Sequence, residues 1–412
     1  MLSGFCPFRH ASSGGSQLAC EGRFFVYLRN AQGSRNAPIC WGRVAALIGR
    51  LTQSMFNKAE ARIEIYTDDP CIALRGTREE RDSMVATIVA LWLCLGLPLS
   101  WKKGSRGTSA DWIGGEFRIL PSPAGVKVRI KQQLLDEAQE LARAAAQESV
   151  ISTRALRTLV GKLSNIANLL VVWRPFLAPM FAALYANHPA GAPPHCIWTK
   201  QILPQLGWLA AFFRGAGGFA ERYFDLSCFL RIDTVVDIVL DASPWGLAGV
   251  LCLNGTSAEY FSDAISPLDV SLFEHIIGEA SGQQVWECLA ALVAVRLWRE
   301  RWQKHQAQLM VRGDSVAMLT LLVNMRPHSP QMRIIAQEMA LDMAHYSFVP
   351  VVAHHIPGIA NVVADELSRW PQPGHVKKIP EFLVGAVQVS PAIRTANYYM
   401  TNLKVAVPFQ EG

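Results

Sequence analysis

Four acidic residues in the second half of the chain lie within or next to apolar stretches. Asp241 and Asp314 follow the apolar runs TVVDIVL and AQLMVRG, and Glu287 and Asp365 interrupt the helical patterns VWECLAAL and VVADELS. Burying a carboxylate costs several kcal/mol unless it is paired or bound to a metal. Taken singly, each residue fits a helix cap, a surface position or an ion pair. Converging together, four carboxylates would hold two divalent cations, which activate a water and stabilise the leaving oxygen in phosphodiester cleavage.

The elements that must position these carboxylates begin at residue 233. TVVDIVLDAS predicts a buried strand, and WGLAGVLCLNG with SAEYFSDAIS completes a three-stranded meander. A helix around Glu287, a strand before Asp314, two helices, the strand FVPVVAHHIPG and a helix around Asp365 follow in that order. This β-β-β-α-β-α-α-β-α order predicts a mixed five-stranded sheet with helices over residues 233–371.

Residues 233–371 resemble the type 1 ribonuclease H domain of a retroelement. The resemblance rests on VLDASPWGLAGVL, WECLAAL, RGDSVAMLTLL and HHIPGIANVVADELSR, of which the last is the most specific. It implies an RNase H fold that cuts the RNA strand of RNA–DNA hybrids with two Mg²⁺ or Mn²⁺ ions. It also implies that Asp241 contacts both ions. Asp365 would contact the ion on the nucleophile side, and Glu287 and Asp314 the other ion.

His355 is a candidate auxiliary residue with two interpretations. Many members of that family carry a His ten residues before the last Asp, in a loop after a Pro-Gly pair. His355 has that spacing to Asp365 but precedes the Pro-Gly, so it also fits an ordinary strand end. Only NMRPHSP separates the two helices after Asp314, and no basic substrate-binding helix fits there. The other half of the chain is therefore expected to hold the substrate.

A second acidic pair, Asp68 and Asp69, lies at the tip of a predicted hairpin in EIYTDDPCIAL. A solvated turn is the simple interpretation, because Asp favours turns. A metal site is the other, since adjacent carboxylates ionise at a cost unless a cation lies between them. The segment Tyr66-Thr67-Asp68-Asp69 resembles the YxDD hairpin of reverse transcriptase palms, which implies that both Asp residues bind metal.

The flanking segments resemble the same palm. QGSRNAPICWGR is similar to the turn and helix that contact template and incoming nucleotide. LGLPLSWKK is similar to the segment whose Lys lies near the phosphates, and WIGGEF to the hairpin that grips the primer end. The matching residues are Gly33, Arg35, Lys102, Lys103, Trp112 and Gly114. The resemblance covers about residues 22–371 and is closest to LTR-type and DIRS-like retroelements.

One departure from the palm pattern concerns its third carboxylate, an Asp upstream of the GSRNAP turn. Residues 1–67 contain no Asp, and their acidic residues are Glu21, Glu60 and Glu64. Without that partner the pair cannot build a two-metal clamp. We therefore expect a ribonuclease H fused to a truncated reverse transcriptase without polymerase activity. Two alternatives stay open: an inactive nucleic-acid-binding remnant, and a fragment of a longer, active RNA-directed DNA polymerase.

These patterns predict a chain of mixed α+β and α/β class. Its segments are an irregular N-terminus (1–21), a partial palm (22–130), a helical thumb (131–185), a connection (186–232), the ribonuclease H-like domain (233–371) and a linker or tail (372–412). In the thumb, a helix opening near Ser152 places its apolar residues on one face. Pro175 and Pro179 are expected to break the segment that follows.

Charge and composition limit the classes of function. Residues 1–232 carry 27 Lys and Arg against 16 Asp and Glu, whereas residues 233–371 carry 8 against 15. The first part suits a polyanion, namely an RNA template, a DNA primer or an RNA–DNA hybrid. The nine cysteines show no metal-binding or disulfide spacing, and the N-terminus has no signal-peptide pattern. We expect an intracellular protein, nuclear or cytoplasmic, with no membrane partner and no small-molecule cofactor.

Overall fold

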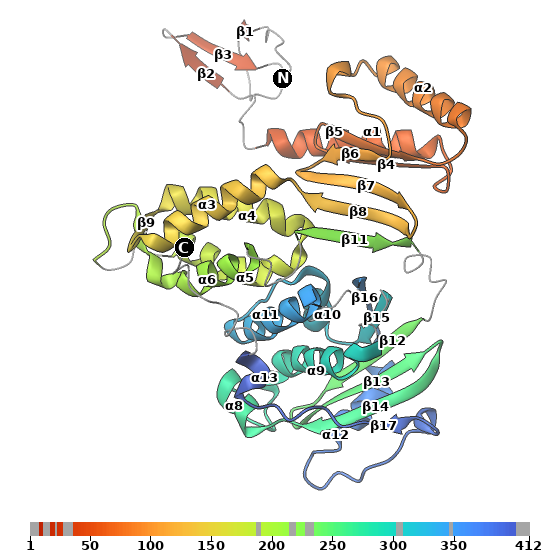
Figure 1. Ribbon diagram of the computed structural model, residues 1–412, viewed down its shortest axis with the longest axis vertical. Helices are drawn as coiled ribbons and strands as arrows, with labels where there is room; N and C mark the ends of the chain where they lie inside the picture. The colour runs from red at the N-terminus through yellow and green to blue at the C-terminus, as the bar shows by residue number, and fades with distance from the viewer. Residues whose placement is uncertain are drawn as a thin grey trace. The chain divides into compact units, whose positions relative to one another are not determined.

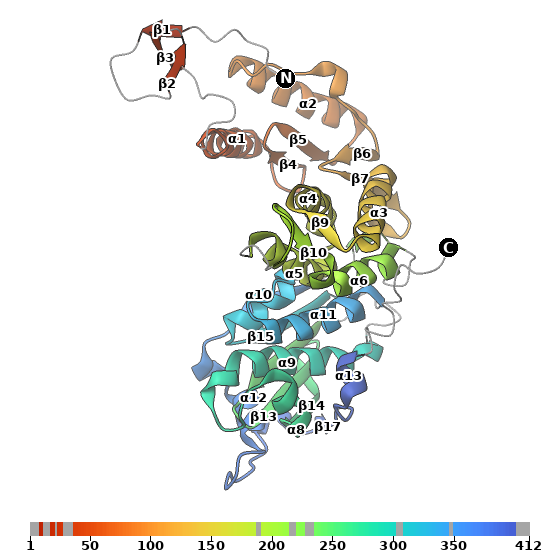
Figure 2. The same cartoon turned by 90° about the vertical axis from the view of Figure 1, so that its left-hand side faces the viewer.

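The computed structural model describes residues 8–10, 17–20, 23–27, 36–186, 191–213, 220–226, 235–301, 308–345 and 349–400. Two compact units divide the chain, Met1–Arg106 and Gly107–Gly412, and each is described by itself. The ribbon is drawn in two views (Figure 1 and Figure 2). Gly33 and Arg35, expected to contact nucleic acid, lie outside the described residues.

The first unit contains a small antiparallel sheet, a β-hairpin and two helices. The sheet has the order β1-β3-β2, with β1 at Phe8–His10, β2 at Gln17–Cys20 and β3 at Arg23–Tyr27. Helix α1 (Ala37–Ser54), the hairpin β4 (Ala61–Tyr66) and β5 (Asp69–Leu74), helix α2 (Arg78–Cys94) and the 3-10 turn η1 (Trp101–Lys103) follow. The segment 1–21 was expected to be irregular, and β1 and β2 differ from that expectation.

Helix α2 is an ordinary packed helix with a defined start. Thr77 and Glu80 form a capping box, which satisfies backbone N–H groups at its start. The indole nitrogen of buried Trp92 donates to Thr52 Oγ1 of α1 at 2.8 Å, which joins the two helices. Within the described residues, the structure has no helix long and apolar enough to cross a bilayer.

The second unit opens with a four-stranded antiparallel sheet of order β11-β8-β7-β6. Its strands are β6 (Ser109–Trp112), β7 (Gly115–Pro121), β8 (Ala124–Ile130) and β11 (Glu221–Asp225). The predicted hairpin around the double glycine is confirmed. Its turn consists of Ile113 and Gly114, both at positive φ (40° and 84°), a conformation that glycine adopts readily.

A helical layer follows that sheet. It comprises α3 (Gln132–Gln147), α4 (Thr153–Leu169), η2 (Val171–Trp173), α5 (Arg174–Tyr185) and α6 (Leu203–Phe213). Two short strands, β9 (Val150–Ser152) and β10 (Cys196–Trp198), pair beside it, and η3 (Thr199–Gln201) leads into α6. The segment 186–232, expected as a connection, therefore supplies α6 to this layer and β11 to the sheet.

The apolar face expected on α4 is confirmed by burial. Ser152 caps the helix by accepting from the Ala155 N–H, and the buried residues on α4 and its C-cap include Leu156, Leu159, Val160, Leu163, Ile166 and Leu170. The expectation that Pro175 and Pro179 break the next segment is wrong. Pro175 lies in the first turn of α5, where its missing N–H costs nothing, and Pro179 lies inside the helix. Burial of neighbours such as Phe176 and Met180 compensates for that lost hydrogen bond.

The rest of the unit is built on a mixed sheet of order β16-β15-β12-β13-β14-β17. Its strands are β12 (Val236–Ala242), β13 (Gly246–Leu253), β14 (Thr256–Ala264), β15 (Gln308–Gly313), β16 (Val349–His355) and β17 (Val387–Gln388). Strands β12, β13 and β14 form the predicted antiparallel meander. Strands β15, β16 and β17 each join by parallel pairing.

Helices pack on both faces of this sheet. On one face a core forms with α8 (Pro267–Phe273), α9 (Gln283–Leu297), α10 (Val316–Asn324) and α11 (Pro330–His345). On the other face α12 (Val362–Arg369) packs Leu367 and Trp370 against β13 and β14. The 3-10 turns η4 (Ala280–Gly282), η5 (Arg299–Arg301) and η6 (Gly358–Ala360) link these elements.

The segment after residue 371 differs most from expectation. It was predicted as a linker and tail, and the sheet was predicted to have five strands. Instead it contributes η7 (Glu381–Leu383), the sixth strand β17 and helix α13 (Ala396–Met400). Leu383 and Tyr399 are buried in the two cores, and buried Arg394 pairs with Asp263 and Asp269. Residues 372–400 are therefore part of the sheet domain.

Candidate metal centre

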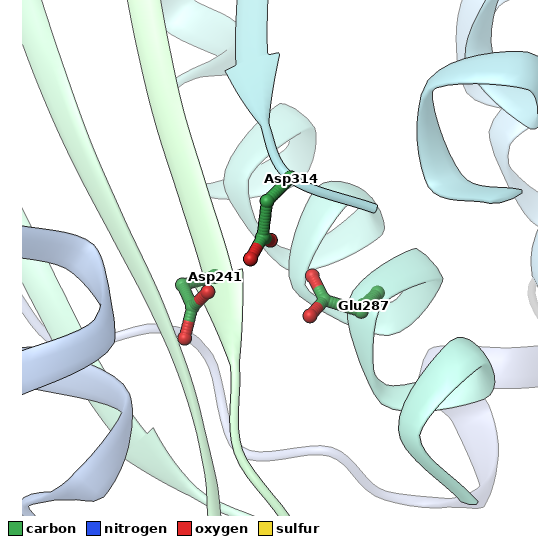
Figure 3. Close-up of side chains that lie close together, drawn as sticks. All are labelled: Asp241, Glu287 and Asp314. Atoms are coloured by element: carbon green, nitrogen blue, oxygen red, sulfur yellow. The ribbon is translucent and has the colours of Figure 1, made fainter. Parts of the chain in front are cut away.

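Three of the four predicted carboxylates converge at the edge where β12 and β15 end. Asp241 belongs to β12, Asp314 directly follows β15, and Glu287 projects from α9. One oxygen from each side chain lies within 4.8 Å of the others, and Figure 3 shows all three carboxylates pointing into one space. Parallel pairing of β12 with β15 places their carboxyl ends side by side, which brings Asp241 and Asp314 together.

Asp241 is held from the opposite face of the sheet by α12 and its cap. The Asn361 amide donates to Asp241 Oδ1 at 3.0 Å, and the Ser368 hydroxyl donates to Oδ2 at 2.7 Å. Asn361 Nδ2 also donates to the Leu240 carbonyl at 3.0 Å, which fixes the helix to the end of the strand. Asp241 is only 4% exposed, so these two donors define the orientation of its carboxylate.

Glu287 lies on a helix whose residues 285–295 are all buried. The Gln283 amide, one turn earlier, donates to Glu287 Oε1 at 3.1 Å and to the Ala242 carbonyl at 2.5 Å. Glu287 Oε2 is buried and has no hydrogen-bond partner among the described residues. A buried carboxylate oxygen without a partner is costly, and a bound cation would satisfy it.

The electrostatics of the cluster favour its protonated forms when no cation is present. Burial, together with the charges of Asp314 and Asp365, raises the pKa of Asp241 to about 7, against the hydrogen bond from Ser368. Burial also raises the pKa of Glu287 well above its ordinary value, and the charges of Asp241 and Asp314 act in the same direction. Like charges this close disfavour joint ionisation, so a divalent cation would stabilise the ionised cluster.

Asp365, the fourth predicted carboxylate, is not brought into this group. It lies in the first turn of α12, and its side chain is 42% exposed. Both of its oxygens accept from Arg369, at 3.0 Å from Nε and 2.7 Å from an Nη atom. Its negative charge still reaches Asp241, whose pKa it raises. In this structure Asp365 is therefore a neighbour of the cluster, and its closest partner is the arginine one turn later.

The three converging side chains fit a hard divalent cation. Carboxylate oxygens are the ligands that Mg²⁺ and Mn²⁺ prefer, and the free Glu287 Oε2 is an available donor. Elsewhere in the described residues, no other group of three or more His, Cys, Asp or Glu side chains could converge on an ion in this way. Asp68 and Asp69 therefore do not form such a group in the part of the chain that the structure describes.

The loop before α12 borders the cluster. His355, the auxiliary candidate, ends β16 opposite Gly313 in the strand register and is exposed. Gly358 lies against Asp314, since a Cβ atom added there would come within 3.0 Å of Asp314 Oδ2. The loop thus restricts the space around Asp314.

The palm-like residues that the structure describes lie in two different units, exposed in the first and half-buried in the second. Asp68 occupies the two-residue turn between β4 and β5, Asp69 pairs with Tyr66, and Tyr66 is 59% exposed. Lys102 and Lys103 form part of exposed η1. In the other unit, the Trp112 ring packs edge-on to Phe117 at 5.8 Å, and Gly114 lies against Asn165 of α4. The predicted hairpin at Asp68 is confirmed, while its metal-binding role stays a prediction.

Our sequence reasoning missed three residues that orient the carboxylates, namely Gln283, Asn361 and Ser368. Their spacing carried a signal. Gln283 precedes Glu287 by four residues in the same helix, and Asn361, Asp365 and Ser368 are separated by four and three residues. Such spacings place side chains on one helix face. Polar residues one turn from a buried carboxylate were therefore candidates for hydrogen-bond donors to the site.

No protein-family profile matches the chain, and no curated protein matches it. Solved structures that it resembles include a foamy viral protease-reverse transcriptase in complex with dsDNA (TM-score 0.38, 14% identity, 83% of this chain and 63% of that one). Another is the foamy viral protease-reverse transcriptase with RNA/DNA hybrid (TM-score 0.39, 14% identity, 89% and 43%). The chain thus spans less than two thirds of these proteins.

Proposed function

We propose that the chain is a retroelement-derived, metal-dependent endonuclease of the ribonuclease H type, which cleaves the RNA strand of RNA–DNA hybrids. The observation that carries this proposal is the convergence of Asp241, Glu287 and Asp314 on one space, with Glu287 Oε2 left without a partner. The type of reaction is inferred from the four sequence motifs around these residues and Asp365, which resemble those of ribonuclease H. The geometry adds a cluster with the ligands that such a reaction needs.

The side chains have distinct tasks in this proposal. Asp241, Glu287 and Asp314 would hold the cation, and Asn361 and Ser368 would keep the Asp241 carboxylate oriented toward it. Gln283 would do the same for Glu287. Divalent cations bound here would activate a water and stabilise the charge that develops on the leaving oxygen.

Asp365 would join the site by leaving its partner. An exposed Arg–carboxylate pair contributes about 0.2–1 kcal/mol, so exchanging Arg369 for a cation is a small cost. If Arg369 never releases Asp365, that carboxylate cannot bind a cation. The Arg369–Asp365 pair would then favour the alternative function, an inactive nucleic-acid-binding remnant. Metal dependence separates the two functions, because only the nuclease needs Asp365 to bind a cation.

Hydrolysis of a labelled hybrid tests the proposed activity. The full chain with Mg²⁺ or Mn²⁺ is expected to cut the RNA strand of an RNA–DNA hybrid and to leave single-stranded RNA and duplex DNA intact. EDTA is expected to abolish the cleavage. Wild-type protein that binds the hybrid but leaves the RNA strand whole at every metal concentration would favour the inactive remnant.

We also propose that the chain does not extend primers as it stands. Residues 1–67 contain no Asp that could complete a clamp with Asp68 and Asp69. Asp68 lies in an exposed turn and Asp69 begins β5, and neither belongs to a three-residue group among the described residues. The segment before residue 233 would then bind the template and primer strands without copying them.

A further inference from the structure

Three arginines from three separate elements gather in the second unit, outside the carboxylate cluster. Arg174 begins α5, Arg222 lies in β11, and Arg326 follows Met325, the C-cap of α10. Helices α5, α10 and α11 lie side by side in both views (Figure 1 and Figure 2). Nothing in the proposed cleavage chemistry uses these side chains.

Arg174 fixes the position of this arginine cluster. Its Nη1 donates to the Asn324 carbonyl at the end of α10 at 3.0 Å, and its Nε donates to the Ala167 carbonyl near the end of α4 at 3.2 Å. Positive charge is favourable at the carboxyl end of a helix, so these contacts explain why the arginine is there. They also bring its charge next to Arg326, two residues beyond Asn324.

Arg222 is held in an environment that is unfavourable for a charge. It is half-buried, and its guanidinium lies 4.6 Å from the centroid of the Phe224 ring. Burial lowers the pKa of Arg222, and the charge of Arg174 lowers it further. Burial likewise lowers the pKa of Arg174, with the charge of Arg326 acting in the same direction. Arg174 is therefore the arginine that lies near each of the other two.

The described residues provide no carboxylate partner for any of the three. Glu221, adjacent to Arg222 in β11, instead binds Lys127 at 2.7 Å and Arg129 at 3.2 Å. Neighbouring strand residues point to opposite faces of the sheet, so Glu221 cannot serve both sides. A cluster of like charges without counter-ions attracts anions.

We propose that Arg174, Arg222 and Arg326 form a binding site for the phosphodiester backbone of the nucleic acid substrate. Guanidinium groups suit phosphate oxygens because their donors form a planar fork and remain charged. This site rests on the proposed function, since it names where the nuclease substrate is held. Arg174 and Arg222 add two cations to those of residues 233–371, which carry 8 basic side chains, Arg326 among them, against 15 acidic ones.

Salt-dependent binding tests this site separately from catalysis. Fluorescence anisotropy of a labelled RNA–DNA hybrid is measured with the full chain in EDTA, so that no cleavage contributes. The Arg222→Gln, Arg326→Gln double variant is expected to bind about tenfold more weakly, because two phosphate contacts are lost. Its slope of log affinity against log salt should fall by about two, since each contact contributes about 0.9 for a duplex.

Arg143→Gln is the matched control, because it removes the same charge from an exposed position on α3. It should leave the salt slope unchanged, and Arg326→Lys should keep most of the affinity by keeping the charge. If Arg222→Gln impairs folding, the exposed Arg326→Gln variant alone should lower the slope by about one. Parent-like affinity and slope in a folded Arg326→Gln variant would overturn the proposal.

Experiments with inorganic phosphate distinguish a site for the phosphates of the nucleic acid backbone from a site for free phosphate. Replacing chloride by phosphate at constant ionic strength should weaken hybrid binding by the parent chain more than by the Arg326→Gln variant if the site takes the nucleic acid backbone, because inorganic phosphate competes for the same guanidinium groups. Thermal stabilisation by inorganic phosphate that the Arg326 variant loses, together with an unchanged salt slope for the hybrid, would mean a free-phosphate site. That result would refute the assignment to substrate, whether or not the chain cleaves RNA.

Discussion

Asp241 is the residue on which the proposed chemistry depends most. It is central to the carboxylate cluster and receives donors from both Asn361 and Ser368. We expect Asp241→Asn to lower the rate of hybrid cleavage by several orders of magnitude, because it removes a metal ligand. Steady-state cleavage assays measure this. Asp136→Asn, on the exposed surface of α3, is the control and should retain the parent rate. Parent-rate cleavage by Asp241→Asn would disprove the site.

The raised pKa of Asp241 gives the stability a defined pH dependence in the absence of metal. Burial raises this pKa from 3.8 to about 7, so between those values the folded protein holds a proton that the unfolded chain has lost. The free energy of unfolding should therefore fall as pH rises from about 4 to about 7, by a few kcal/mol in order of magnitude. Glu287, whose pKa is also raised, acts in the same direction.

Urea unfolding in EDTA across this pH range measures the effect. Mg²⁺ should restore stability at neutral pH, and Asp241→Asn should flatten the profile because asparagine does not titrate. A stability that rises with pH between about 4 and 7 in EDTA would contradict the proposed electrostatics of the cluster.

Gly358 tests how closely the loop before α12 confines Asp314. A Cβ atom there would lie 3.0 Å from Asp314 Oδ2, so Gly358→Ala should displace that carboxylate. We expect weaker Mg²⁺ binding by calorimetry and a higher Mg²⁺ requirement for cleavage. Gly161→Ala is the control, because nothing lies within 4 Å of a Cβ atom there and alanine favours the helix α4. Equal Mg²⁺ affinity in both variants would show that Asp314 is not confined by the loop.

At the scale of elements, the segment after residue 371 secures the sheet domain. Arg394, whose side chain is 2% exposed, donates to Asp269 at 2.8 Å and also pairs with Asp263. Arg394→Gln should destabilise the domain by about 3–5 kcal/mol, because it leaves a fully buried Asp269 without its cation. Thermal unfolding measures the loss, and Arg143→Gln should leave the melting temperature nearly unchanged. A parent-like melting temperature for Arg394→Gln would contradict this role.

The elements differ in how well the sequence predicted them, and length explains the difference. Long apolar patterns such as those of α4 and α9 predicted their helices and buried faces, because periodicity over many residues is a strong signal. Strand β17 has two residues and helix α13 five, which is too short for a period to be visible. Leu383 lies between Phe382 and Val384, which are exposed, so local sequence does not show which of the three is buried. The burial of Leu383, Arg394 and Tyr399 therefore depends on tertiary contacts.

The sequence predicted part of the carboxylate cluster, as it predicted part of the fold. Asp241, Glu287 and Asp314 come together as the strand and helix pattern indicated, since each lies at or beside a long, well-predicted element. Asp365 was expected among them but accepts from Arg369 instead. A side-chain rotamer on an exposed helix face is decided by local partners and by bound ligands, neither of which a pattern of residue types contains.

At the scale of the whole molecule, the proposed hybrid cleavage should occur without primer extension. We expect no template-dependent extension of oligo(dT) on poly(rA) with Mg²⁺ or Mn²⁺, because no Asp precedes Asp68 to complete the clamp. The same preparation should cleave hybrid, which proves that it is folded. Nucleotide incorporation that Asp68→Asn abolishes would contradict the expectation.

The pairing of Arg394 with Asp269 also sets an order of events during synthesis. The two residues are 125 positions apart, and both are buried in the finished domain. Until the ribosome has translated the residues between them, Asp269 has no arginine partner with which it could be buried as an ion pair. The sheet domain therefore cannot reach its native state co-translationally until the last of these residues has left the exit tunnel, and such sequence-distant closure slows folding. Protease sensitivity of stalled nascent chains that end before residue 394 would be high, and it would drop once the arginine has emerged.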